Sequence, residues 1–352
     1  MNTRIIYVQE EQVEKQDALL RQAGEVLKKG GLVAFPTETV YGLGGDGLNR
    51  ESSKKIYAAK GRPSDNPLII HIVDMDALPF IVSEVSPSVR KVADAFWPGP
   101  LTMILPKSDN VPDETTGGLK TVAVRMPSHK VARKLIQYAG GYVAAPSANA
   151  SGKPSPTLAK YVIEDMDGRI DMIIDGGEVG IGLESTIIDM TVNPPQILRP
   201  GFITENMLER VLGDVDVDKT ILSNDSKLAP KAPGMKYRHY APKGQLTIVV
   251  GEPEKVVAYI NEQSAVARRS GKKVGIIGSE ELLNHYQAES VKSAGSRDDE
   301  QAIAHNLYRI LREFDDEDVE VIYSESFDSG DMGQAIMNRL LKAAGHNVLE
   351  VQ

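Results

Sequence analysis

Residues 32–44 read LVAFPTETVYGLG, an apolar stretch that runs directly into a polar loop. The composition of residues 32–36 predicts a short buried strand. The loop after it contains two hydroxyls, a carboxylate and two glycines: Thr37, Thr39, Glu38, Gly42 and Gly44. Ligands of open α/β sheets bind at the carboxyl ends of strands, so this loop is well placed to receive one. A tight turn whose hydroxyls cap the next segment is an equally good interpretation.

Helix and strand signals alternate on both sides of this stretch. An amphipathic helix is expected over 16–29, ended by two glycines, and another over 51–60 with Ser52 or Ser53 as its cap. Further strands are predicted at 68–73, 101–105, 121–125, 142–145, 172–175, 185–189 and 196–199, with helices around 87–96, 129–139 and 204–212. The pattern predicts an α/β fold with a mixed sheet.

Proline marks a boundary near residue 245, because 19 of the 20 prolines precede it. The segment 201–244 ends in LAPKAPGMKYRHYAPKG, which is typical of an extended linker. Its aromatic rings favour a linker that packs on something, such as an active site. Beyond it, strands are expected at 246–250, 273–277 and 319–323, and helices at 253–270, 298–314 and 333–344. This order predicts a small doubly wound, Rossmann-like sheet.

Composition excludes several classes of function. The 352 residues carry a net charge of −9, and residues 245–352 hold 19 acidic against 11 basic side chains, which argues against a general nucleic-acid binder. The absence of cysteine excludes thiolate metal sites and cysteine nucleophiles. The first twenty residues are acidic and lack an apolar core, so a secretory signal is not expected, and a cytoplasmic location fits. The six histidines lack metal-ligand spacing, and no P-loop or HExxH pattern is present.

Basic side chains stand at constrained positions where elements end. Lys60 and Arg62 flank Gly61 in a loop stiffened by two prolines, and such a pair can bind phosphate or carboxylate, although a solvated basic turn is the simpler interpretation. Arg125 and Arg199 each close an apolar strand, as an ion-paired structural residue or as a carboxylate clamp. His71 lies within a strand, where a hydrogen-bonded core histidine is the commoner case.

Two further loops are rich in small polar residues. Residues 146–155 follow a strand and read PSANASGKPS, which exposes backbone N–H groups that suit an oxyanion or a nucleotide. Residues 182–189 read GLESTIID and lead into another strand. Taken singly, each loop has an ordinary structural explanation, but five such sites in one domain favour a ligand-binding function.

In this order, FPTETVYGLG, KGRPSDNPL, VAVRMPSH, APSANASGKPSPT and GLESTIID resemble the YrdC-like domain of threonylcarbamoyl-adenylate synthases. The linker KYRHYAP and the tail GQAIMNRLLKAAG are similar to the long, two-domain form. The resemblance implies a YrdC-like twisted mixed sheet with a concave cationic cavity over 14–200. It also implies a linker covering the active site over 201–244 and a Rossmann-like α/β domain over 245–352.

The resemblance further implies a nucleotidyltransferase that makes threonylcarbamoyl-AMP and pyrophosphate from L-threonine, bicarbonate and ATP, for later transfer to tRNA by a separate complex. The positions that match the family's threonine site are Thr39, His71, Arg125, Ala145 and Ser185. Those that match its ATP site are Arg62, Asn66, Thr121, Ser147, Ser155, Arg199 and Tyr237. The catalytic tetrad would be Lys60, Arg62, Ser147 and Asn149. Magnesium is expected with ATP, without a dedicated set of protein ligands.

Two other functions stay open at this point. Hydrogenase maturation proteins share the domain, but they carry cysteine zinc fingers, which this chain lacks. The second is a non-catalytic RNA- or tRNA-binding protein that uses the same cationic cavity. The near-neutral charge of residues 1–244 suits a small anionic ligand better than RNA.

Overall fold

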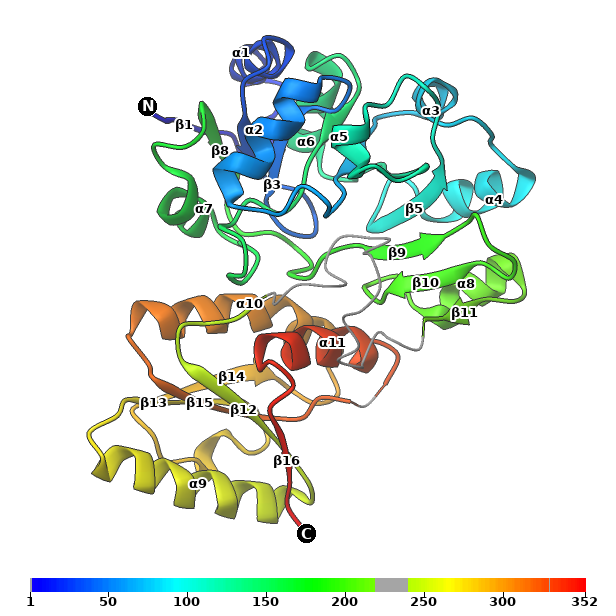
Figure 1. The fold of residues 1–352 in the computed structure, drawn as a ribbon. Coiled ribbons are helices and arrows are strands. Elements are labelled where there is room, and N and C mark those ends of the chain that lie inside the picture. The colour runs from blue at the N-terminus through cyan, green and yellow to red at the C-terminus, as the bar shows by residue number, and fades with distance from the viewer. Residues whose placement is uncertain (1, 219–239, 329) are drawn as a thin grey trace. The chain divides into compact units, whose positions relative to one another are not determined.

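The computed structural model describes residues 2–218, 240–328 and 330–352, and these form two compact units. The first comprises 2–151 and 155–218, and the second comprises 152–154 and the described residues from 240 onward. Each unit contains one sheet (Figure 1). Within the described ranges, every helix is too short or too polar to cross a membrane.

The first unit is built on a sheet in the order β1-β8-β2-β3-β7-β4-β6-β5-β9-β10-β11. Its strands are β1 (Arg4–Tyr7), β2 (Val33–Phe35), β3 (Gly42–Asp46), β4 (Ile69–His71), β5 (Leu101–Pro106), β6 (Thr121–Arg125), β7 (Val143–Ala144), β8 (Met172–Asp175), β9 (Thr186–Asp189), β10 (Gln196–Arg199) and β11 (Asp216–Val217). Parallel and antiparallel pairs both occur, so the predicted mixed sheet is confirmed.

Helices cover this sheet and create three apolar clusters. They are α1 (Asp17–Lys28), α2 (Arg50–Lys60), α3 (Leu78–Ile81), α4 (Pro87–Phe96), α5 (Asp113–Thr116), α6 (Lys130–Tyr138), α7 (Ala159–Met166) and α8 (Glu205–Leu212), with short 3-10 turns at Glu10–Gln12 and Met75–Ala77. One cluster joins α1 and α6 to β2 and β8, and a second joins α2 and α7 to β2 and β3. The third packs α4 and α8 on the β4–β6 region.

Side-chain alternation gives the two faces of β4, β5 and β6 different characters. Val122 and Val124 of β6 point into the large cluster under α4 and α8, whereas Ala123 belongs to a small cluster with Ile69 and Ile104. Successive residues of a strand point to opposite faces, so Thr121 and Arg125 share the face of Ala123. The polar ends of these strands therefore lie on the face opposite the large core.

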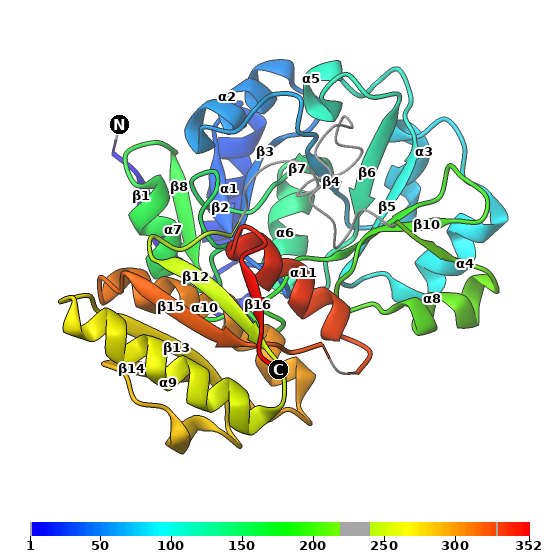
Figure 2. The same cartoon turned by 60° about the horizontal axis from the view of Figure 1, so that its bottom comes forward.

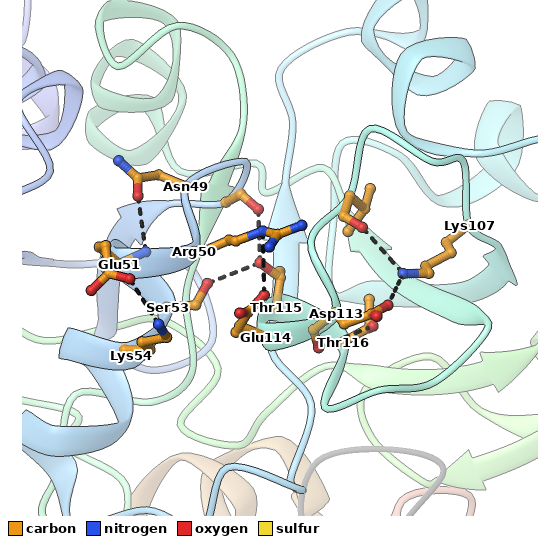
Figure 3. Close-up of polar contacts among 12 residues, drawn as sticks. Asn49, Arg50, Glu51, Ser53, Lys54, Lys107, Asp113, Glu114, Thr115 and Thr116 are labelled. Carbon is orange, nitrogen blue, oxygen red and sulfur yellow. Dashed lines mark hydrogen bonds and ion pairs between the residues drawn. The ribbon is translucent and has the colours of Figure 1, made fainter.

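Helix α2 is anchored at its N-terminal end, as Figure 3 shows. The Asn49 side chain accepts a hydrogen bond from the Glu51 N–H, so Asn49, and not Ser52 or Ser53 as predicted, caps the helix. Ser53 is instead buried and bonds the Thr115 hydroxyl of α5 at 2.9 Å. These contacts hold the helix whose last residue is Lys60.

The second unit is a five-stranded sheet in the order β14-β13-β15-β12-β16, with every pair parallel. Its elements are β12 (Gln245–Val250), α9 (Pro253–Arg269), β13 (Val274–Ser279), η3 (Leu283–His285), β14 (Ser290–Gly295), α10 (Glu300–Asp316), β15 (Val321–Glu325), α11 (Gly333–Ala343) and β16 (Val348–Glu350). Helix α9 covers one face, and α10 and α11 the other (Figures 1 and 2). The predicted doubly wound arrangement is confirmed, with β14 and β16 added.

The first unit differs from the predicted span of 14–200. Strand β1 pairs with β8, and β11 pairs with β10, so both lie in this sheet. The segment predicted as a linker from residue 201 therefore begins with helix α8 and strand β11. Residues 42–44, expected as part of a loop, belong to strand β3, because glycines leave room for the Phe35 and Ile56 side chains at that point. Residues 219–239 of the predicted linker, with Tyr237, lie outside the described residues.

Candidate functional site

Arg125, at the end of β6, is a buried arginine with three kinds of partner. Its Nη1 donates to the Thr39 hydroxyl at 2.9 Å, and its Nε donates to the Gly99 carbonyl at 3.4 Å. Its Nη2 lies 2.7 Å from a carboxylate oxygen of Glu38. The sequence left a structural ion pair and a carboxylate clamp open, and the structure shows the ion pair with Glu38.

His71 lies beside Arg125 because the parallel strands β4 and β6 pair these two residues in register. The imidazole Nδ1 faces the Ile69 carbonyl at 3.2 Å, which requires a proton on that nitrogen. Burial and the nearby Arg125 charge lower the pKa of His71 from 6.5 to about 3. The ring is therefore neutral at pH 7.

A second arginine, Arg199, connects β10 through Ser185 and Thr102 to the group of Arg125 and His71. Thr102, on β5, is paired with Arg125 in the antiparallel register, and its hydroxyl bonds the Ser185 hydroxyl at 2.8 Å. Arg199, at the end of β10, donates from Nε to the Ser185 carbonyl at 3.0 Å and from Nη2 to its hydroxyl at 3.2 Å. Ser185 therefore lies between the two arginine-bearing strand ends.

Three of the four predicted catalytic residues, Lys60, Ser147 and Asn149, gather where α2 ends. The Lys60 ammonium donates to the backbone oxygens of Ser147 at 2.5 Å and Asn149 at 2.6 Å. The Ser147 hydroxyl donates to the Asn149 side-chain oxygen at 2.5 Å. A buried cation, a hydroxyl and an amide thus meet in the loop after β7, and Lys60 is 3% exposed.

A short piece of chain joins this group to Arg125. The Ala148 N–H donates to the Tyr41 carbonyl at 2.8 Å, and Ser147 forms an isolated antiparallel bridge with Gly42. Tyr41 and Gly42 lie two and three residues after Thr39. Ala145, the first residue after β7, donates its N–H to the Ile69 carbonyl at 2.9 Å.

Arg62 and Asn66 shape the loop between α2 and β4. The Arg62 guanidinium donates to the Asn66 carbonyl at 3.2 Å and to the Pro67 carbonyl at 3.0 Å. Asn66 is 1% exposed, and its side-chain oxygen has no hydrogen-bond partner among the described residues. An unpaired buried acceptor is costly in a folded protein, so Asn66 marks a point where a ligand donor fits.

Ser155 donates to the Glu184 carboxylate at 2.5 Å, which ties the loop after β7 to the residue before Ser185. Glu184 and Glu38 were not predicted as site residues, although they lie in the motifs GLESTIID and FPTETVYGLG. A single acidic residue in a polar loop gives no signal until its partner is known. The structure supplies those partners, Ser155 for Glu184 and Arg125 for Glu38.

Two predicted residues stand apart from this network. Thr121 begins β6, four residues before Arg125, and at about 3.3 Å per residue it lies roughly 13 Å away along the strand. It does share the sheet face of Arg125. Tyr237 falls outside the described residues. Within the described ranges, no group of three or more histidine, aspartate or glutamate side chains is placed to hold a metal ion.

The fold and site define an α/β protein in which four buried cations from separate elements adjoin hydroxyl-rich loops: Lys60, Arg62, Arg125 and Arg199. Such a set suits a small ligand with several anionic groups. Two family models match the chain, one described as "Telomere recombination" over residues 25–201 and one as "Threonylcarbamoyl-AMP synthase, C-terminal domain" over 203–345. The chain belongs to the family of threonylcarbamoyl-AMP synthases.

Similar proteins cover nearly the whole chain. A threonylcarbamoyl-AMP synthase of Pyrococcus abyssi is 48% identical over 332 residues, which are 94% of this chain and 96% of that protein. The Bacillus subtilis threonylcarbamoyl-AMP synthase is 46% identical over 96% of both chains. The crystal structure of Pyrococcus abyssi Sua5 complexed with L-threonine matches with a TM-score of 0.93 at 46% identity, covering 99% of this chain and all of that one.

Proposed function

We propose that this protein is an L-threonylcarbamoyladenylate synthase that forms threonylcarbamoyl-AMP and pyrophosphate from L-threonine, bicarbonate and ATP. One observation carries the proposal. Arg125, His71 and Ser185 are gathered by strand register, and the same loop contacts join them to Lys60 and Ser147. These contacts support a single site that combines an amino-acid carboxylate binder with a phosphate-binding group.

In this proposal, the threonine substrate lies among Thr39, His71, Arg125, Ala145 and Ser185. The Arg125 guanidinium binds its carboxylate, because a planar fork matches two carboxylate oxygens. Neutral His71 and the Ser185 hydroxyl are available for its polar groups.

The nucleotide is assigned to the loops that carry the remaining cations: Arg62, Asn66, Thr121, Ser147, Ser155, Arg199 and Tyr237. The carbamate of threonine attacks the α-phosphate, a P–O bond forms to the carbamate oxygen, and the bond to pyrophosphate breaks. Lys60, Arg62, Ser147 and Asn149 stabilise the charge that builds on the phosphate oxygens, which makes the enzyme a nucleotidyltransferase. Magnesium accompanies the triphosphate and is held by it and by water.

Release of pyrophosphate with each substrate omitted in turn tests the proposal. We expect release to require L-threonine, bicarbonate and ATP together, and mass spectrometry to detect threonylcarbamoyl-AMP. ATP cleavage that ignores threonine or bicarbonate would contradict it. A salt-dependent gel shift with tRNA and no pyrophosphate release would instead support the RNA-binding alternative. The proposal places the enzyme in the cytoplasm, where a separate transfer complex passes its product to tRNA.

A further inference from the structure

Glu38 is a buried carboxylate that has no role in the proposed reaction. It lies in the loop after β2, directly before Thr39, and its side chain is 14% exposed. One oxygen lies 2.7 Å from Arg125 Nη2, the group proposed to bind the substrate carboxylate. In this structure, the Arg125 guanidinium is therefore paired with a carboxylate of the protein's own chain.

The Glu38–Arg125 pair is held by charge rather than by well-formed hydrogen bonds. Among the described residues, neither Glu38 oxygen has a hydrogen-bond partner of good geometry, and neither does Arg125 Nη2. A carboxylate offers about four acceptor positions, and a buried one is costly unless these are filled. Burial opposes ionisation, but Arg125, helped by the backbone N–H groups of Glu38 and Ser128, outweighs it and lowers the pKa of Glu38. Glu38 is thus an ionised group with acceptor capacity to spare.

Glu38 also has room to turn away from Arg125. Glu38 lines a cleft of about 560 Å³ within the first unit, together with Ser128, His129 and four further acidic residues: Glu10, Glu11, Asp175 and Glu178. A rotation toward this space would separate the carboxylate from the guanidinium. Opening the pair leaves one positive and one negative group facing each other across a small gap.

An α-amino acid matches that arrangement. Its carboxylate and amino group are attached to the same carbon, so opposite charges lie about 3 Å apart. Arg125 supplies the partner for the carboxylate, and Glu38 is the adjoining anion. Exchanging one internal ion pair for two pairs with a zwitterion keeps the buried site electrically neutral, which avoids the cost of an uncompensated charge.

We propose that Glu38 binds the α-amino group of the amino-acid substrate and so positions the nitrogen that becomes carboxylated. The inference rests on the proposed function, since it assumes that the substrate carboxylate binds Arg125. The nitrogen keeps one N–H in the carbamate, so Glu38 also holds the carboxylated substrate in place.

Calorimetric titration of the full-length protein with two ligands tests this role. One ligand is L-threonine, and the other is (R)-3-hydroxybutanoate, which keeps the carboxylate, hydroxyl and methyl group but lacks the amine. Glu38→Gln removes the charge at nearly constant shape. We expect it to weaken threonine binding by about 10- to 100-fold, the loss typical of one hydrogen bond to a charged group. Binding of 3-hydroxybutanoate should stay unchanged or tighten, because a competing carboxylate has left Arg125.

Matched variants separate this role from a structural one. Glu11→Gln removes an exposed carboxylate from the same cleft and should leave both affinities within twofold. Glu38→Asp should recover part of the threonine affinity, and ATP binding by each variant reports that the site is folded. Equal losses for both ligands in Glu38→Gln, or no loss for threonine, would overturn the proposal. Equal affinity of the unmodified protein for the two ligands would also overturn the proposal. This comparison does not depend on whether the variants fold. If the unmodified protein binds no threonine, the proposed function itself fails.

Discussion

The ammonium group of Lys60 donates to the backbone oxygen of Ser147 at 2.5 Å, across 87 positions of the chain. The contact joins the last residue of α2 to the loop after β7. It places a buried positive charge in the loop that carries the Ser147 hydroxyl and the Asn149 amide. Lys60 therefore both shapes this loop and supplies charge to it.

Replacing Lys60 with alanine should lower the rate of pyrophosphate release by about 10²- to 10³-fold, the usual loss when one preorganised charge stabiliser is removed. Steady-state kinetics with saturating threonine and bicarbonate measure it. The control is Lys54→Ala on the same helix, where the lysine is exposed and pairs with Glu51 at 2.7 Å. A Lys60 variant that keeps its secondary structure and more than a fifth of the rate would exclude a catalytic role.

Arg125→Lys tests the carboxylate clamp. The variant keeps the charge and loses the planar fork that reaches Thr39 and Glu38 at once. We expect kcat/KM for threonine to fall about 10- to 100-fold, the equivalent of one charge-assisted hydrogen bond, with ATP binding unchanged. Arg90→Lys, an exposed position on α4, serves as the control. An equal loss of ATP affinity would show that Arg125 acts on the fold rather than on threonine.

His71 should make stability depend on pH. The folded state binds its proton only near pH 3, whereas the unfolded chain binds one near 6.5. Between these values the unfolded state holds more protons, so the free energy of unfolding falls as the pH falls. The slope from His71 is at most about 1.4 kcal/mol per pH unit.

Urea unfolding at pH 7, 6 and 5 measures this slope above the range in which carboxylates titrate. His71→Asn should flatten it, because the amide cannot take up a proton there. His285→Asn, the same substitution at an exposed histidine of the second unit, is the matched control. Identical slopes in the unmodified protein and His71→Asn would contradict the assignment of the buried neutral ring.

Two glycines with the same backbone angle should respond differently to alanine. Gly61 has φ 62° and ends α2, and no described atom lies within 4 Å of a Cβ built there. Gly117 has φ 61°, but its Cβ would lie 3.0 Å from the Asp65 carbonyl oxygen. Gly61→Ala should cost about 1–2 kcal/mol from the left-handed backbone alone, and Gly117→Ala should cost more. Urea midpoints at constant m-value measure both, and equal costs would refute the steric argument.

Local patterns in the sequence predicted most elements of both sheets, and they failed where short-range signals are weak. Strand β3 is rich in glycine, which ordinarily argues against a strand, and its pairing with β2 depends on the space that glycine leaves for Phe35. Strands β1 and β11 are short edge strands whose partners, β8 and β10, are far away or separated by a helix. Whether such segments form strands depends on tertiary pairing rather than on their local sequence.

For the site, the sequence by itself determined which polar residues end which strands, because apolar runs and turn residues are local properties. These local properties identified four candidates: Arg125, Arg199, Lys60 and the loop of Ser147. Only the tertiary structure decided their neighbours. The parallel register of β4 and β6 brings His71 to Arg125, and the fold carries Glu38 to the same guanidinium over a separation that no local pattern encodes. Register and long-range charge pairing arise from packing the whole sheet, since a strand shows its own alternation but not the strand beside which it folds.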